Sequence, residues 1–287
     1  MLDVNKAGME SLVKASMPTP EPPLPESTTI PESELTFEEW ALKFSPLRGR
    51  SYSDFSDFEQ ATVKQSFACA TSEAMVSLLR SVQHVVHKGI PGAFVKCGVW
   101  TGGNIELMIR TLQKLGVTDR DIYAYDTFAG MPRPDAIDDD NTTGGAVTHA
   151  WETHRTQADG EAGSDWMRIT LEWVRNRIEC LNYPSERLHF VKGMVEDTIP
   201  ATIPGKIAIL RLDTDFYAST KHELKHLYPR LSPGGILIID DYGAMPGSRI
   251  ATDEYLREQN IPLFLNRVDA HVRLAVKPPR RYGLRLR

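Results

Sequence analysis

The sequence of 287 residues has little cysteine, only Cys69, Cys97 and Cys180 at wide spacings. Such spacing is typical of neither a disulfide framework nor a zinc site, so we expect reduced core residues. The sequence also lacks an apolar run of the roughly 18 to 20 residues that span a bilayer, and its start lacks the apolar segment of a secretory signal. These absences predict a cytoplasmic protein without a membrane partner.

An excess of basic charge is also missing. The 33 Lys and Arg residues are outnumbered by 38 Asp and Glu residues, which gives a formal net charge of -5. Such a chain has no general attraction for phosphate backbones, so we do not expect nucleic acid as a partner. The hydrophobic content of 41% is ordinary for a globular protein with a sizeable core.

The arrangement of apolar and turn residues divides the chain into three parts. Six prolines in PTPEPPLPESTTIPE predict a disordered arm over residues 1–34. Helical spacing, clearest in SEAMVSLLRSVQHVVHKG with its terminal Gly89, predicts a helical N-terminal lid or cap over residues 35–89. Residues 90–287 alternate short β-rich runs with helical stretches, which indicates an α/β domain with a mostly parallel sheet. The last two runs, LFLNRV and HVRLAV, predict an antiparallel hairpin at one edge.

A glycine-rich turn follows the first predicted strand of this domain. The segment VKCGVWTGGN places Gly98, Gly102 and Gly103 between a strand and a helix, where backbone N–H groups can approach a ligand. The next strand, DIYAYD, ends in Asp126, whose carboxylate can accept both hydroxyl hydrogens of a ribose. Together they favour an adenosine-type ligand, although a plain tight turn and a solvated strand end are alternatives.

Four aspartates follow two later strands. Asp213 and Asp215 end LRLDTD, and Asp240 and Asp241 end GGILIIDD. If the two strands are neighbours, four carboxylates converge, and each pair about 4 Å apart repels by roughly 4 kcal/mol at an effective dielectric of about 20. Either a hard divalent cation such as Mg²⁺ offsets this repulsion, or some carboxyl groups are protonated. The alternative is that the aspartates only cap the following helices.

An acidic loop, PDAIDDDNTTGG, contains Asp135, Asp138, Asp139 and Asp140. It lacks the glycine and the terminal glutamate at the spacing of a calcium-binding EF-hand loop, so we expect a solvated or substrate-covering loop instead.

Several segments, in order and at natural spacing, carry a family resemblance: IPGAFVKCGVWTGGN, YAYDTFAGMPRPD, VKGMVEDTIP, LRLDTDFYASTKHELKHLYPRLSPGGILIIDDYGAMPGSRIATDEY and RVDAHVRLAVK. Over residues 75–277 the chain resembles the metal-dependent, S-adenosylmethionine-dependent O-methyltransferases of the macrocin, mycinamicin and noviose type. The resemblance implies a Rossmann-like class I methyltransferase fold and a cytoplasmic homodimer or larger homo-oligomer. It implies methyl transfer to a hydroxyl of a small molecule, a natural product or its sugar.

The resemblance also implies roles for individual residues. Asp213, Asp240 and Asp241 would hold Mg²⁺, and Asp215 would be the general base. S-adenosylmethionine would be bound by the glycine turn, by the end of the second strand and by the stretch around Gly193, that is, by Lys96, Gly98, Trp100, Gly103, Asn104, Asp126, Thr127, Phe128, Gly193, Val195 and Asp213.

Two residues depart from the family pattern. Most relatives have an acid before the Cys-Gly pair and an arginine after the Trp, where this chain has Lys96 and Thr101. A lysine there should oppose the cationic amino group of the cofactor unless its ammonium turns towards the carboxylate. These departures leave open a non-catalytic binding protein with the methyltransferase fold. The DTD motif leaves open a second alternative, a Mg²⁺-dependent phosphohydrolase with an aspartate nucleophile.

Overall fold

The computed structural model describes residues 55–139, 146–156 and 163–279. The predicted proline-rich arm over residues 1–34 lies outside this part of the chain, as do residues 35–54 of the predicted helical segment. The described part of that segment is helical: it contains α3 and α4.

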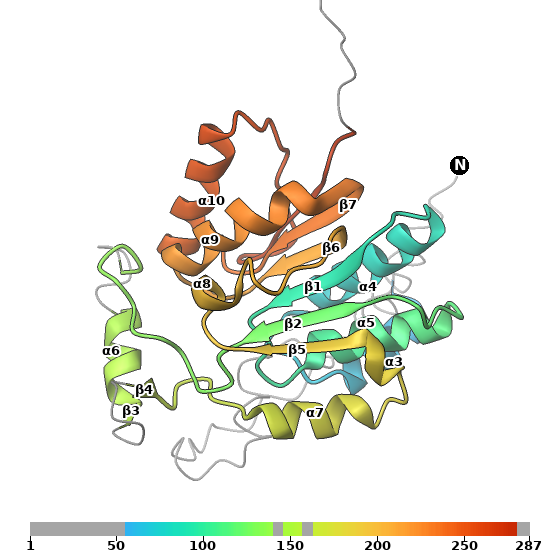
Figure 1. Ribbon diagram of the computed structural model, residues 1–287, viewed down its shortest axis with the longest axis horizontal. Helices are drawn as coiled ribbons and strands as arrows, with labels where there is room; N and C mark the ends of the chain where they lie inside the picture. The colour runs from blue at the N-terminus through green and yellow to red at the C-terminus, as the bar shows by residue number, and fades with distance from the viewer. Residues whose placement is uncertain (1–54, 140–145, 157–162, 280–287) are drawn as a thin grey trace, which may run out of the picture. The chain divides into compact units, whose positions relative to one another are not determined.

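A seven-stranded sheet forms the centre of the described structure, with the strand order β5-β2-β1-β6-β7-β9-β8 (Figure 1). The neighbouring strands from β5 to β7 pair in parallel, whereas β9 is antiparallel to both β7 and β8. The predicted parallel sheet with an antiparallel hairpin at one edge is thus confirmed. The strands are β1 (Ala93–Cys97), β2 (Ile122–Asp126), β5 (Leu188–Lys192), β6 (Ile207–Leu212), β7 (Leu231–Ile239), β8 (Asn266–Arg267) and β9 (Arg273–Val276).

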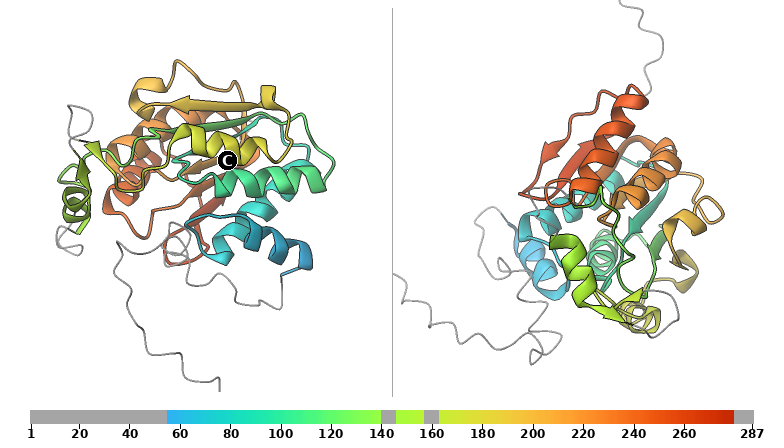
Figure 2. Two further views of the ribbon diagram at one scale, coloured as in Figure 1. Left: turned by 90° about the horizontal axis from the view of Figure 1, so that it is seen from below. Right: turned by 90° about the vertical axis from the view of Figure 1, so that its left-hand side faces the viewer.

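Helices cover both faces of this sheet, as the two views of Figure 2 also show. Adjacent residues of β1 point to opposite faces, as a strand requires. Phe94 packs in a buried cluster with Leu78 of α4, and Val95 packs in a second cluster with Leu224 of α9. The α-helices are α3 (Asp57–Gln65), α4 (Ser72–His87), α5 (Gly103–Lys114), α6 (Ala146–Thr153), α7 (Leu171–Glu179), α8 (Val195–Thr198), α9 (Tyr217–Leu227) and α10 (Pro246–Glu258). Short 3-10 turns at η2 (Ser185–Arg187) and η3 (Tyr228–Arg230) and a small ladder of β3 (Arg155–Thr156) with β4 (Gly163–Ser164) complete the elements.

The amphipathic pattern of α4 explains its place against the sheet. Met75, Leu78 and Val82 recur at helical spacing, and all three are fully buried. The Thr71 side chain caps the first turn by accepting from the Ala74 N–H at 3.1 Å. Gly89 ends the helix in a left-handed conformation with φ of 61°, as predicted.

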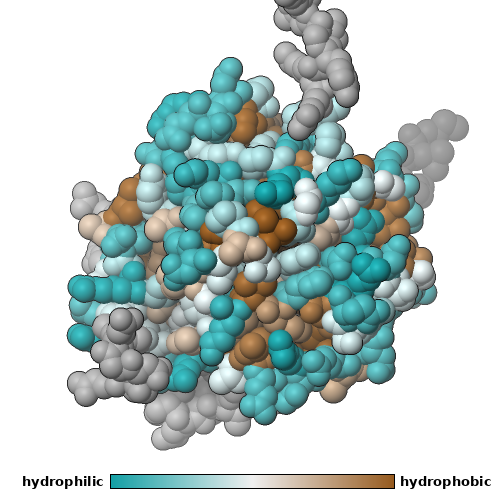
Figure 3. Space-filling view, viewed as in Figure 1, coloured by the Kyte–Doolittle hydropathy of each residue, from teal (hydrophilic) through white to brown (hydrophobic). Residues whose placement is uncertain are grey.

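The surface is mixed in character. The face in Figure 3 is mostly hydrophilic with smaller hydrophobic areas between. Within the described residues, every helix is too short or too polar to cross a membrane. All three cysteines are free, but only Cys97 is fully buried. The prediction of a core position is wrong for Cys180, which is exposed because the C-cap of α7 leaves its side chain at the surface.

Candidate active site

The register of the parallel strands brings the predicted site residues into one row. Cys97 of β1 pairs with Tyr125 of β2 and with Leu212 of β6, and Leu212 pairs with Ile239 of β7. The residue that follows each of these strand positions lies at the carboxyl edge of the sheet. That row consists of Asp126, Gly98, Asp213 and Asp240. Since neighbouring strands lie about 4.8 Å apart, four distant segments of the chain meet at one edge.

Gly98 and Asp126 shape the turn after β1. Gly98 has a φ of 74°, and a Cβ atom there would collide with the backbone oxygen of Asp213. The Oδ2 atom of Asp126 accepts hydrogen bonds from the N–H groups of Val99 at 2.5 Å and Trp100 at 3.1 Å. Its Oδ1 atom accepts from the Phe128 N–H at 2.6 Å. In this structure, Asp126 therefore organises both the glycine turn and the start of the loop after β2.

Thr101 and Gly103 fix the far end of the same turn to the segment between α3 and α4. The Thr101 hydroxyl donates to the backbone oxygen of Phe67, and a Cβ atom at Gly103 would collide with that oxygen. Thr101 is fully buried. The residue that departs from the family pattern at this position therefore has a packed place and a hydrogen-bond partner of its own.

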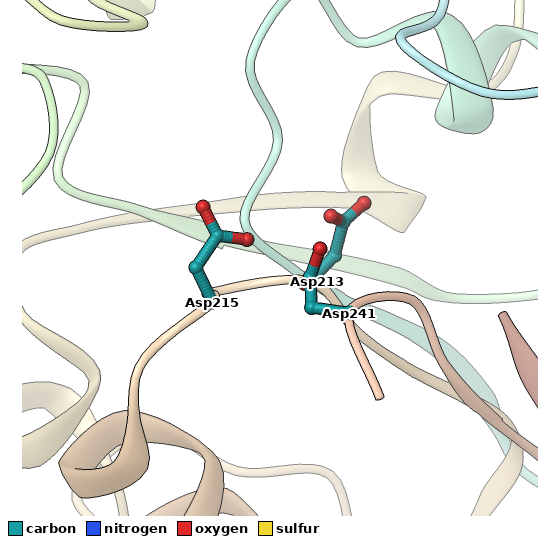
Figure 4. Close-up of side chains that lie close together, drawn as sticks. All are labelled: Asp213, Asp215 and Asp241. Atoms are coloured by element: carbon teal, nitrogen blue, oxygen red, sulfur yellow. The ribbon is translucent and has the colours of Figure 1, made fainter. Parts of the chain in front are cut away.

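Three carboxylates after β6 and β7 lie close enough to hold a metal ion. One oxygen each from Asp213, Asp215 and Asp241 lies within 4.8 Å of the others. Figure 4 shows their carboxyl groups on the same side of the strand ends. Asp241 can face the same site as Asp213 because β7 ends at Ile239, before the two aspartates. Oxygen ligands in such a group suit Mg²⁺.

Asp240, the third predicted metal ligand, has a different partner. Its Oδ1 atom accepts from the Nη2 atom of Arg211, a fully buried residue of β6. The Nε atom of Arg211 lies 3.6 Å from Oδ2 of Asp213. Lys96 of β1 also donates from Nζ to Asp213 Oδ2 and to the backbone oxygen of Gly98. The acidic cluster thus has two buried cations directly beside it.

The surroundings shift the pKa values of the acids in different directions. Burial raises the pKa of Asp215 to about 6, and the nearby Asp213 charge adds to the rise. Burial also raises the pKa of Asp241 well above its ordinary value, together with repulsion from Asp215 and Asp213. Burial likewise raises the pKa of Asp240 despite Arg211. Burial acts in the same sense on Asp213, but Lys96 and Arg211 outweigh it and hold its pKa below the ordinary value. Asp213 is therefore the acid most strongly held in the charged form.

A cavity of about 370 Å³ opens above this edge of the sheet. Most of the predicted site residues line it: Lys96, Gly98, Trp100, Asp126, Thr127, Gly193, Val195, Asp213, Asp215, Asp240 and Asp241. Gly103, Asn104 and Phe128 do not line it: Gly103 and Asn104 begin α5, and Phe128 lies in the loop after β2.

A largely apolar part of the cavity wall was not among the predicted site residues. These residues come from loops that follow β2, precede α7 or α10, or join β8 to β9: Met131, Pro132, Trp166, Met167, Ala244, Met245 and His271. Met194 lies within the predicted stretch around Gly193 but was not singled out. Loop residues of this kind have no periodic spacing. A signal was present for the residues that fall within the segments carrying the family resemblance, namely Met131, Pro132, Ala244, Met245 and His271, but not for Trp166 and Met167.

The acidic loop after β2 is attached to the start of α9. Asp138 is buried, and its Oδ1 atom accepts from the Tyr217 N–H at 2.7 Å. Asp139 accepts from the Val147 and Thr148 N–H groups at the start of α6. Asp135 is exposed, and Asp140 lies outside the described residues. The loop is thus anchored by capping two helices, and Met131 and Pro132 at its start border the cavity.

The fold and the site together define a class of enzyme. A doubly wound sheet with a glycine turn after β1, an acid at the end of β2 and a cavity at the carboxyl strand ends is that of the Rossmann-like class I methyltransferases. Among solved structures, the O-methyltransferase NovP is similar, with a TM-score of 0.65 and 26% identity over 75% of this chain and 84% of that one. The calicheamicin methyltransferase CalS11 shares the fold with a TM-score of 0.55 at 18% identity, over 82% of this chain and 90% of that one.

The family follows from the sequence match. The family model described as Macrocin-O-methyltransferase (TylF) matches residues 56–274. The chain therefore belongs to the macrocin O-methyltransferase family of S-adenosylmethionine-dependent O-methyltransferases.

Curated relatives agree with this membership. The chain is 34% identical over 188 residues to the 8-demethyl-8-(2,3-dimethoxy-alpha-L-rhamnosyl)-tetracenomycin-C 4'-O-methyltransferase of Streptomyces olivaceus. The matched region covers 66% of this chain and 67% of the relative. It is 32% identical to the demethyldecarbamoylnovobiocin O-methyltransferase of Streptomyces niveus, over 62% of this chain and 63% of the relative. It is 33% identical to the mycinamicin III 3''-O-methyltransferase of Micromonospora griseorubida, over 62% of this chain and 66% of the relative. The matches thus span about two thirds of the length of these relatives.

Proposed function

We propose that this protein transfers a methyl group from S-adenosylmethionine to a hydroxyl group on the sugar of a small natural product, and that the reaction depends on Mg²⁺. The observation that carries the proposal is the register of β2, β1, β6 and β7. It places Asp126, the turn at Gly98 and the acids after β6 and β7 around one cavity.

The residues of the cavity wall fit S-adenosylmethionine. The turn at Gly98 offers a close backbone approach, and Asp126 and Thr127 offer polar atoms at the end of β2. Gly193 and Val195 provide a small and an apolar surface on the next strand end, which suit an adenine ring. Bound here, S-adenosylmethionine supplies an electrophilic methyl group. The chain's own part is to orient it and to exclude water from the reacting atoms.

The acidic cluster fits a divalent cation. Asp213 and Asp241 have ligand oxygens within 4.8 Å of one another. Burial raises the pKa of Asp241, and repulsion from the neighbouring aspartates adds to the rise; a bound cation would relieve that repulsion. We assign Asp213 and Asp241 as ligands. Asp240, which accepts from Arg211, stays a predicted third ligand. When bound, Mg²⁺ supplies Lewis-acid chemistry that lowers the pKa of a substrate hydroxyl.

Asp215 is the residue that we assign as the general base. Its carboxylate lies within the acidic cluster and also borders the cavity. A pKa of about 6 leaves it largely ionised at neutral pH yet basic enough to accept a proton. Asp215 therefore holds the proton that the attacking hydroxyl gives up.

The sugar as acceptor is inferred from the relatives. The name of the Streptomyces olivaceus enzyme specifies a rhamnosyl group, and that of the Micromonospora griseorubida enzyme specifies mycinamicin III. Vicinal sugar hydroxyls offer two neighbouring oxygens for a metal site built from carboxylates. The methionine and tryptophan side chains of the cavity wall offer apolar surface for the rest of such a substrate.

Methyl transfer to sugar-bearing acceptors tests the proposal directly. We expect the purified protein to convert S-adenosylmethionine to S-adenosylhomocysteine with such an acceptor and Mg²⁺, and to lose this activity with excess chelator. Asp241→Asn should reduce turnover at least about 100-fold, because it replaces a charged metal ligand by a neutral amide. Product formation is measured by mass spectrometry.

Asp119→Asn is the matched control, since Asp119 is exposed at the amino ends of the strands, away from the acidic cluster. It should keep wild-type activity. Full turnover by the wild type in chelator would refute the metal requirement, whereas release of phosphate from phosphate esters without methyl transfer would favour the phosphohydrolase alternative. Family membership favours methyl transfer over that alternative.

A further inference from the structure

Two buried cations lie side by side beneath the acidic row. Lys96 of β1 is the register partner of Arg211 of β6, so the two side chains leave neighbouring strands on the same face. Lys96 is 1% exposed and Arg211 is 0% exposed. Two such charges in a sheet core repel one another and lose their hydration, so each requires an anionic partner.

Each cation has its partner in the acidic row, two residues further along the neighbouring strand. Lys96 Nζ pairs with Oδ2 of Asp213, and Nη2 of Arg211 pairs with Oδ1 of Asp240. Lys96 Nζ also donates to the backbone oxygens of Gly98 and, at 3.3 Å, of Cys97. Its ammonium therefore has partners in three directions and is held at the turn after β1.

The two ion pairs do not neutralise the whole acidic cluster. When all four carboxyl groups, those of Asp213, Asp215, Asp240 and Asp241, are ionised, they face two cations and leave an excess of two negative charges. A single divalent cation balances that excess. Without the charge of Lys96 the excess would be three, and the attraction for a divalent cation would be stronger.

We propose that Lys96 is a built-in counter-ion of the acidic cluster: it holds Asp213 in place without metal and lowers the affinity of the cluster for a divalent cation. This proposal rests on the metal site of the proposed function and adds to it the residue that tunes metal affinity. Lys96 acts through Asp213, and is thus a positioning residue.

Metal titration of a charge-removing variant tests this role. Lys96→Met keeps a long apolar stem but removes the ammonium. We expect it to bind Mn²⁺ at least about tenfold more tightly than the wild type in calorimetric titration, because a repelling charge is removed. In chelator its Tm should be lower than that of the wild type, and Mn²⁺ should raise the Tm of the variant more. Structural damage alone would weaken metal binding, so a gain of affinity is specific to the charge.

Lys64→Met is the matched control, because Lys64 is an exposed lysine of α3 and should leave metal affinity unchanged. Lys96→Gln provides a second neutral variant that can still donate to the backbone oxygen of Gly98. Unchanged or weaker Mn²⁺ binding by the neutral variants overturns the proposal. Failure of both variants to fold even with Mn²⁺ present also overturns it, since the metal should replace the lost positive charge.

The outcome is separable from that of the proposed function. Tighter metal binding by Lys96→Met, with no methyl transfer by the wild type, would support the counter-ion and refute the reaction. Methyl transfer by the wild type, with unchanged metal affinity in the variant, would do the reverse.

Discussion

Glu223 of α9 is a buried acid beneath the active-site strands. It is 0% exposed, and its Oε1 atom accepts from the Thr214 hydroxyl at 3.0 Å, between the two aspartates that follow β6. Burial raises the pKa of Glu223 to about 8 from an ordinary value of 4.5. The folded protein therefore binds more protons than the unfolded chain between these two pH values. The stability contribution of the protonated form is complete below pH 4.5 and is lost as the pH rises through 8.

Glu223→Gln is neutral at every pH and should not show this loss. We expect its free energy of unfolding to exceed that of the wild type by a margin that grows between pH 5 and pH 8, up to a few kcal/mol, on the order of 1.4 kcal/mol per pKa unit. Urea unfolding at several pH values measures this margin. Glu186→Gln, an exposed acid, serves as the control and should follow the wild type. Parallel pH profiles for Glu223→Gln and the wild type would contradict the prediction.

At the scale of elements, the start of α9 depends on a distant loop. The N-cap residue of α9 is Phe216, whose side chain has no hydrogen-bond acceptor for the first free N–H groups of the helix. Asp138 supplies the missing acceptor from the loop after β2, and a Cβ atom at Gly247, near the start of α10, would collide with its Oδ1 atom. Three segments are therefore joined at the point where α9 leaves the acidic cluster.

Asp138→Ala should loosen this junction. We expect a loss of about 1 to 2 kcal/mol in the free energy of unfolding, because a charged acceptor at a helix N-terminus is removed. The amide hydrogen of Tyr217 should exchange faster with solvent, which hydrogen exchange with mass spectrometry detects. Asp135→Ala, at an exposed position of the same loop, is the control. Equal exchange at Tyr217 in Asp138→Ala and the wild type would show that the loop contributes nothing to the helix start.

At the scale of the whole molecule, the cavity collects residues from strand ends and loops that lie far apart in the sequence. A ligand that fills it contacts the turn after β1, the end of β2 and the segment after β5, so that binding stabilises the folded state as a whole. S-adenosylhomocysteine at about 100 times its dissociation constant should stabilise the fold by about 2.7 kcal/mol, which corresponds to roughly 5 to 10 °C in Tm for a domain of this size.

Asp126→Asn should reduce that ligand-induced rise in Tm. The amide keeps one acceptor oxygen but loses the charge that holds the backbone N–H groups and that we propose also accepts from the ribose hydroxyls. Differential scanning fluorimetry with and without S-adenosylhomocysteine measures the effect, and Asp119→Asn again provides a control. An undiminished rise in the Asp126→Asn variant would show that Asp126 organises the turn without contacting the cofactor.

The order and type of the elements follow from local properties of the sequence. The alternation of β-rich and helical runs predicted the parallel sheet and its antiparallel edge, because burial on both faces and helical periodicity are local properties of the chain. It also marked the glycine turn at Gly98, the acid at Asp126 and the two pairs of aspartates, since strand ends in such a sheet share one edge. The roles of these residues in binding and catalysis stay predictions.

The pairing of the buried charges, in contrast, depends on how distant strands pack together. The registers of β1 with β6 and of β6 with β7 place Lys96 beside Arg211, and each beneath its acid. They turn Asp240 towards Arg211 and leave Asp213, Asp215 and Asp241 as the group that can hold a metal. The apolar cavity-wall residues Trp166 and Met167, from the loop before α7, likewise could not be predicted from the sequence. Register and loop conformation arise from packing between segments that are distant in the chain. Local sequence spacing therefore does not predict them.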